Sequence, residues 1–164
     1  MTYNELTRRY FENPARLGTL AGPDCCRGAA GSRSAGTWVQ FDVRVARTAA
    51  GPRVREVRFL AFGCPHVIAA AGLVAEAGAG GAAEPRLPQS IHALRERLDA
   101  PVEKLGRLFV VEDAWIAALR AAHTHITQSS CEKSAFQVRC RAAWRVLCTC
   151  CYHPGAGRGE DTAT

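Results

Sequence analysis

The sequence predicts an α+β fold, in which a small antiparallel sheet packs against helices. Two stretches with strand alternation, 38–47 and 54–62, follow each other across a turn. A third stretch, 67–77, is almost entirely small or apolar and suits a buried helix. With 48% hydrophobic and 22% charged residues in 164, the composition is that of one globular domain that can bury a core.

The N-terminal part predicts a helix and then a long loop. Thr2 and Glu5 form a capping-box pattern. Three residues at helical spacing supply a face that can be buried: Tyr3, Leu6 and Tyr10. Asn13 precedes a proline, and a residue in that position avoids helical geometry, so the helix is expected to end there. Residues 15–37 are rich in glycine and alanine and show no strand pattern, which indicates a loop.

The two predicted strands form a hairpin. In the first, from Trp38 to Arg47, polar residues alternate with Val39, Phe41, Val43 and Val45. Residues 49–52 contain Gly51 and Pro52 and predict a turn. The chain then returns as the second strand, 54–62.

The C-terminal half predicts two helices and a tail. A short helix buries Ile91, Leu94 and Leu98, and Pro101 follows it. A longer helix runs from Lys104 to about His123, with its apolar side formed by Leu105, Leu108, Phe109, Ile116 and Leu119. We therefore expect one domain over residues 1–123. The basic, cysteine-rich residues 124–164 are expected to be a weakly ordered tail.

Phe62-Gly63-Cys64-Pro65-His66 links the second strand to the apolar helix. Pro65 suits the first helical position, where a missing N–H costs nothing. Cys64 is then expected at the helix N-terminus, where the dipole favours a thiolate. Such a thiolate suits metal binding or sulfur transfer. The alternative is a buried, inert cysteine.

Charge and cysteine content narrow the function classes. The net charge is +6, but the arginines are scattered and no aromatic residues interleave with them, so we expect a solvated basic surface and no nucleic-acid partner. No run spans a bilayer and the N-terminus lacks a signal pattern, which favours the cytoplasm. In a reducing compartment, eight cysteines indicate metal or thiol chemistry. Residues 148–153 are a further candidate for a soft metal.

The order of these parts resembles the NifU/IscU-type iron–sulfur cluster assembly scaffold proteins. Four features carry the resemblance, which covers about residues 2–122: Glu12-Asn13-Pro14, Phe62-Gly63-Cys64, Lys104 and Glu112-Asp113-Ala114. It implies about three antiparallel strands and a non-enzymatic scaffold that holds a transient [2Fe–2S] cluster or iron. It also implies a cysteine desulfurase and cluster acceptors as partners, and Cys64 and Lys104 as site residues.

Most of the ligands that the resemblance implies are replaced in this chain. Residues 34–37 stand where the family has a cysteine and an aspartate, and residues 106–107 stand where it has a histidine and a cysteine. Only Cys64 remains of three cysteines. The missing ligands could be replaced by His66, Cys25, Cys26, the tail cysteines, or Cys64 of a second copy in a homodimer. Zinc is an alternative metal. Only Pro101 and Lys104 match the chaperone-recognition segment, so an Hsp70-type partner is not expected.

The sequence is also compatible with two alternative functions. The first is a degenerate scaffold fold that acts as a metal-free interaction module for a desulfurase or an acceptor. The second is a thiol enzyme or sulfur relay in which Cys64 is the nucleophile. Neither alternative involves a membrane.

Overall fold

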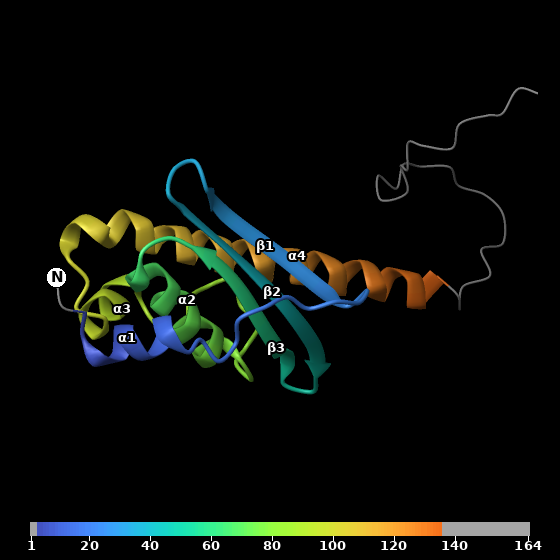
Figure 1. The fold of residues 1–164 in the computed structure, drawn as a ribbon. Helices are drawn as coiled ribbons and strands as arrows, with labels where there is room; N and C mark the ends of the chain where they lie inside the picture. The colour runs from blue at the N-terminus through green and yellow to red at the C-terminus, as the bar shows by residue number, and fades with distance from the viewer. Residues whose placement is uncertain (1–2, 136–164) are drawn as a thin grey trace, which may run out of the picture.

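The structure, a computed structural model, describes residues 3–135, with side chains through residue 126. Its three strands form one antiparallel sheet of order β1-β2-β3, with helices against one face (Figure 1). This arrangement confirms the predicted α+β fold. The elements are α1 (Glu5–Glu12), β1 (Cys25–Ser32), β2 (Thr37–Thr48), β3 (Gly51–Phe62), α2 (Pro65–Gly78), α3 (Ile91–Arg97), the 3₁₀ turn η1 (Val102–Lys104) and α4 (Leu105–Ala135).

Strands β2 and β3 form the predicted hairpin, and the apolar residues that alternate along β2 share one face of the sheet. Val39, Phe41 and Val43 are completely buried on the face toward the helices. The register runs from Trp38 opposite Phe62 to Thr48 opposite Gly51, and it shifts by one residue between Arg44 and Val45. This bulge breaks the period of two in β3, so that two valines three positions apart, Val54 and Val57, are both buried.

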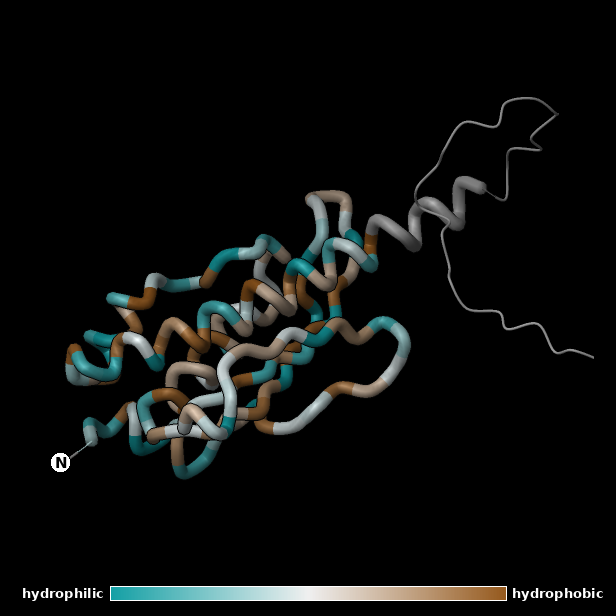
Figure 2. The backbone as a smooth tube through the Cα atoms, turned by 90° about the horizontal axis from the view of Figure 1, so that it is seen from above, coloured by the Kyte–Doolittle hydropathy of each residue, from teal (hydrophilic) through white to brown (hydrophobic). Residues whose placement is uncertain are grey.

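Helix α4 lies along β1 and β2, while α2 covers β3 (Figure 1). The Trp115 ring meets Phe41 edge-on, with 5.3 Å between ring centroids. Hydropathy alternates along α4, as expected for a helix with one buried face (Figure 2). That face consists of Leu108, Val111, Ala114, Trp115, Ala118, Leu119 and Ala122. Phe109 was predicted there, but its side chain is 43% exposed, because each helical residue turns about 100° from the last. No helix in residues 3–135 is long and apolar enough to cross a membrane.

Strand β1 lies inside the predicted loop 15–37, so the loop prediction was wrong for these residues. The strand pairs with β2 from Cys25 opposite Arg44 to Ser32 opposite Thr37. Most residues of β1 are small, because α4 crosses the strand at close range. A Cβ at Gly28 would lie 2.0 Å from the backbone nitrogen of Ala118. Small residues that admit a helix backbone do not produce the β-branched pattern of an ordinary strand.

The N-terminal helix is capped differently from the prediction. Asn4, not Thr2, is the N-cap residue of α1, and its side chain accepts a hydrogen bond from the Thr7 amide at 2.8 Å. The Thr7 hydroxyl donates to the Leu98 carbonyl oxygen at 2.9 Å, and the Asn4 side-chain amide donates to the carbonyl oxygen of Arg97. These bonds join α1 to the end of α3, which leads directly into η1.

Candidate functional site

Cys64 is the N-cap residue of α2, and Pro65 occupies the first turn, as predicted. The Cys64 thiol is free and partly exposed, and no side chain caps this end of the helix. The Cys64 carbonyl accepts the amide of Val67 at 2.9 Å, so the helix begins at once after the turn. The thiol therefore lies beside the positive end of the α2 dipole, in a position from which it can reach a ligand in solvent.

Three chain segments meet at this end of the sheet. The turn between β1 and β2 approaches the Cys64 turn, since a Cβ at Gly63 would lie 3.7 Å from the Gly36 carbonyl oxygen. The first turns of α4 approach as well, since a Cβ at Gly31 would lie 2.8 Å from Cγ1 of Val110. Residues 34–37, Cys64 and residues 106–107 therefore come from separate segments but belong to the same end of the molecule.

His66 is buried at this end of the sheet. Its side chain is 5% exposed, and the Tyr3 ring meets it edge-on at 5.0 Å. Burial lowers the pKa of His66, the positive charge of Lys104 lowers it further, and Asp99 opposes them weakly. The ring is therefore neutral at pH 7. Lys104, a predicted site residue, is therefore one of the two charged groups that act on His66.

Cys25 and Cys26 lie at the other end of the sheet. Cys26 is opposite Val43 on β2, whereas Phe62, two residues before Cys64, is opposite Trp38. Five residues of strand separate these positions, which corresponds to about 17 Å. Burial raises the pKa of both thiols, Asp42 raises that of Cys25 further, and Cys25 and Asp24 raise that of Cys26. The structure does not bring these two thiols to Cys64.

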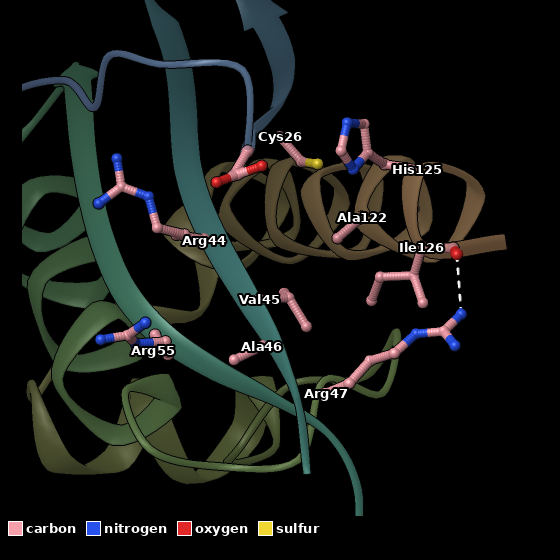
Figure 3. A pocket seen from close by; sticks show the side chains of 10 residues that line it. Cys26, Arg44, Val45, Ala46, Arg47, Arg55, Ala122, His125 and Ile126 are labelled. Carbon is pink, nitrogen blue, oxygen red and sulfur yellow. Dashed lines mark hydrogen bonds between the residues drawn. The ribbon is translucent and has the colours of Figure 1, made fainter. Parts of the chain in front are cut away.

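Cys26 instead lines a hollow of about 300 Å³ between β2 and α4 (Figure 3). The Arg47 guanidinium donates to the carbonyl oxygen of Ile126 at 2.8 Å. Arg44 is held by Glu56 and by the carbonyl oxygen of Ala21. Figure 3 shows the guanidinium groups of Arg44 and Arg55 on the side of β2 away from Arg47. These charges therefore do not converge on one anion site.

The described residues do not form a complete metal site. Among residues 3–126, no three side chains of histidine, cysteine, aspartate or glutamate lie close enough together to hold a metal ion. A [2Fe–2S] cluster takes four protein ligands, and Cys64 and His66 alone do not supply them. The predictions for Cys131 and the later tail cysteines concern side chains outside the described residues.

Sequence reasoning missed Thr37. Its hydroxyl oxygen is buried without a hydrogen-bond partner, and the only other such side-chain atom among the described residues is Nδ1 of His66. The resemblance marks residues 34–37 as the position of a ligand loop in the family, but the burial of the Thr37 hydroxyl depends on the packing of β2 and has no local signal in the sequence.

Comparisons with known proteins give a family and a fold. Residues 2–128 match the family model described as the NifU-like N terminal domain. The crystal structure of a nitrogen-fixing NifU-like protein (N-terminal) from Brucella abortus superposes with a TM-score of 0.55 and 18% identity, covering 74% of this chain and 94% of that chain.

A putative iron–sulfur cluster assembly scaffold protein for the SUF system from Fervidobacterium islandicum AW-1 superposes with a TM-score of 0.53 and 11% identity, covering 71% of this chain and 96% of that chain. A search of curated protein sequences gives no significant match. The two superpositions are evidence of fold, and the family match extends over most of the chain. The chain therefore belongs to the family of NifU-like N-terminal domains, the NifU/IscU type of iron–sulfur cluster assembly scaffold.

Proposed function

We propose that this protein binds iron or a transient [2Fe–2S] cluster at the Cys64 thiolate and passes it to an acceptor protein. One observation carries the proposal: Cys64 is a free, partly exposed thiol at the N-terminus of a buried helix, where three segments of the scaffold fold meet. A thiolate in that position binds iron and remains open to a partner. The partners that we propose are a cysteine desulfurase and cluster acceptors, in the cytoplasm.

One chain supplies too few ligands for a cluster, so the remaining ones must come from elsewhere. We propose that a homodimer shares one cluster, for which the Cys64 thiolates of the two copies supply two of the four protein ligands. His66 lies two residues from Cys64, but its burial under Tyr3 makes it a ligand only if the N-terminal segment moves. Lys104 contributes positive charge near the anionic cluster. Zinc would compete for the same thiolates.

Anaerobic reconstitution tests this proposal directly. The background variant carries serine at the five cysteines outside the described side chains, Cys131, Cys140, Cys148, Cys150 and Cys151. Iron and sulfide should give sulfur-to-iron charge-transfer absorption that Cys64→Ala abolishes and Cys25→Ala, a matched control at the far end of the sheet, retains. Iron analysis should give one cluster for two chains. A colourless wild-type protein without bound iron would refute the proposal.

The shortage of ligands favours a second candidate function, a metal-free interaction module. The scaffold fold would then dock on a cysteine desulfurase or an acceptor without binding metal. Its test is a pull-down of a desulfurase by metal-free protein. Binding that is the same in Cys64→Ser, together with no iron uptake, would favour this function over cluster binding. Loss of desulfurase binding in Cys64→Ser would count against it.

A further inference from the structure

The two edges of the sheet differ in what covers them. The outer side of β3 bonds to residues 16–18 through Phe59 and to residues 80–81 through Val54. Strand β1 forms the other edge (Figure 1). Apart from the first amide of the strand, the backbone of β1 has no hydrogen bond outside its pairing with β2 among the described residues. An open edge of this kind is a template for a further strand.

The register shows which groups of β1 point to the open edge. Because Phe59 bonds away from β2, its partner Phe41 is not hydrogen-bonded to β3 and bonds with β1 instead. Phe41 is opposite Gly28, and bonded positions alternate along an antiparallel pair, so Gly28 bonds with β2 and its two neighbours do not. The N–H and C=O groups of Arg27 and Ala29, which are both exposed, therefore point to the open edge.

Strand β1 lacks the features that usually keep an exposed edge from pairing. It contains no proline, lysine or bulge, and its register with β2 advances one residue at a time over all 8 residues. Its one charged residue, Arg27, turns back over the sheet, where its guanidinium bonds the Asp42 carboxylate on β2 at 2.7 Å. The strand itself therefore does not deter another strand.

Helix α4 gives this edge an apolar wall. The Ala117 backbone meets Gly28, and the Val110 side chain, two turns earlier, approaches the same strand at Gly31. Ala117 is two residues beyond Trp115, which packs on α2, so it lies about 200° round the helix from that contact. Val110 and Ala117 therefore border the open side of β1, and both are partly exposed. Apolar side chains of an added strand would be buried against them.

The same helix prevents a second copy of this chain from pairing through β1. Neighbouring strands are about 4.8 Å apart, whereas packed helices need about 8–10 Å between their axes. Because α4 crosses directly over Gly28, the α4 helices of two copies joined β1 to β1 would overlap there. A single extended segment brings no helix with it and fits.

Charge determines the chemistry of the segment that fits. The Arg27 side chain is half exposed, and Nε and one terminal nitrogen bond Asp42, which leaves N–H donors for a carboxylate on a strand beside it. The whole chain has a net charge of +6. We propose that the β1 edge binds an extended segment of a partner protein in which small apolar residues, facing α4, alternate with acidic residues on the face of Arg27. This surface does not depend on iron binding at Cys64.

A titration of the full-length protein with a peptide, followed by NMR, tests the proposal. The probe is a blocked peptide of alternating glutamate and valine, about seven residues long, which is the length of a typical strand. Saturable shifts are expected at the amides of Arg27 and Ala29. Two matched peptides, one with lysine for glutamate and one with N-methylated edge-facing amides, should bind at least about tenfold more weakly. Equal binding of the three peptides would overturn the proposal.

Two protein variants test the edge and the wall separately. Ala29→Pro removes an edge-facing N–H without removing a bond to β2, a position where an edge strand tolerates proline. It should weaken binding at least about tenfold, whereas Ala29→Val keeps the N–H and should bind as wild type does. Ala117→Glu places a carboxylate on the apolar wall and should weaken binding to a similar extent. Binding at wild-type strength by either of the two weakened variants, once its melting curve shows that it folds, would overturn the proposal.

Hydrogen exchange of the free protein distinguishes other occupants of the edge. The Gly28 amide bonds with β2, so the amides of Arg27 and Ala29 should exchange at least about tenfold faster than it does. Equal protection of the three amides would overturn the proposal, because the edge would then already be covered. Protection that rises with protein concentration would assign that cover to a second copy, and protection independent of concentration would assign it to another segment of this chain.

Discussion

Replacing Gly28 by alanine tests the placement of α4, the helix whose first turns border the Cys64 end. An added Cβ would lie 2.0 Å from the backbone nitrogen of Ala118 and 2.6 Å from its Cα. An ordinary contact needs at least about 3.4 Å, so the helix and β1 would have to separate by about 1.4 Å. Ala118 is completely buried, and the contact is with backbone, so no side-chain rotation relieves it.

The expected cost of Gly28→Ala is large for one methyl group. Overpacking a core costs about 1–3 kcal/mol when side chains can adjust, and a helix backbone adjusts less, so we expect a loss of about 3 kcal/mol or more. In a protein of this size that loss lowers the melting temperature by about 6–12 °C. Urea unfolding, followed by circular dichroism, measures it as a lower midpoint with an unchanged slope.

Two further variants control for the general effects of adding or removing a methyl group. Gly106→Ala places a Cβ where nothing lies within 4 Å, so it should be neutral or stabilising by up to about 1 kcal/mol. Ala118→Gly should not rescue Gly28→Ala, because the clash is with the helix backbone. Surface substitutions usually change the free energy of unfolding by no more than about 0.5 kcal/mol. If the free energy of unfolding of Gly28→Ala lies that close to the wild-type value, α4 does not cross β1 at this point.

Two pH dependences follow from buried ionisable groups. Burial and Lys104 lower the pKa of His66. The contribution of the neutral ring to the free energy of unfolding is therefore complete above the ordinary pKa of about 6.5. Below that pH, the contribution decreases by at most about 1.4 kcal/mol per pH unit. His66→Gln should remove this slope in urea unfolding between pH 7 and 5, and an unchanged slope would refute the assignment. Burial raises the pKa of Asp42, but hydrogen bonds from Arg27, Leu20 and Gln40 outweigh it and lower the pKa. Asp42→Asn should therefore cost about 1–2 kcal/mol at pH 7, a figure reduced because Arg27 is half exposed, and the cost should shrink as pH falls below about 4. An equal cost at pH 7 and pH 3 would contradict this reasoning.

The elements that could be predicted are those whose pattern reflects one simple environment. The β2–β3 hairpin has one face in the core, so period-two alternation marks it. Helix α2 is buried nearly all round, so a continuous apolar run marks it. Strand β1 has neither property, because Gly28 and its small neighbours make room for α4. Its pattern reflects a contact with residues about 90 positions away, which a local reading does not contain.

The candidate site likewise has features that a local pattern predicts and features that depend on residues far away in the sequence. Pro65 is a local signal for a helix start, so the position of Cys64 at the N-cap of α2 could be predicted. The burial of His66 could not, because the ring that packs against it belongs to Tyr3 at the N-terminus. The loop reading also placed Cys25 and Cys26 on a flexible segment, whereas β1 pairs them with Arg44 and Val43 on β2.

The pairing of Cys25 and Cys26 with β2 limits which cysteines can join Cys64 as cluster ligands. A thiolate binds a metal at about 2.3 Å, whereas about 17 Å of strand lies between the level of Cys26 and the end of β3 that leads to Cys64. For Cys26 to reach Cys64, β1 would have to leave β2 and withdraw from α4, which would expose completely buried residues such as Phe41 and Ala118. Any cluster held at Cys64 in the folded protein therefore draws its other thiolates from beyond residue 126 or from a second molecule. Measuring clusters per chain in the variant with serine at the tail cysteines distinguishes these two sources.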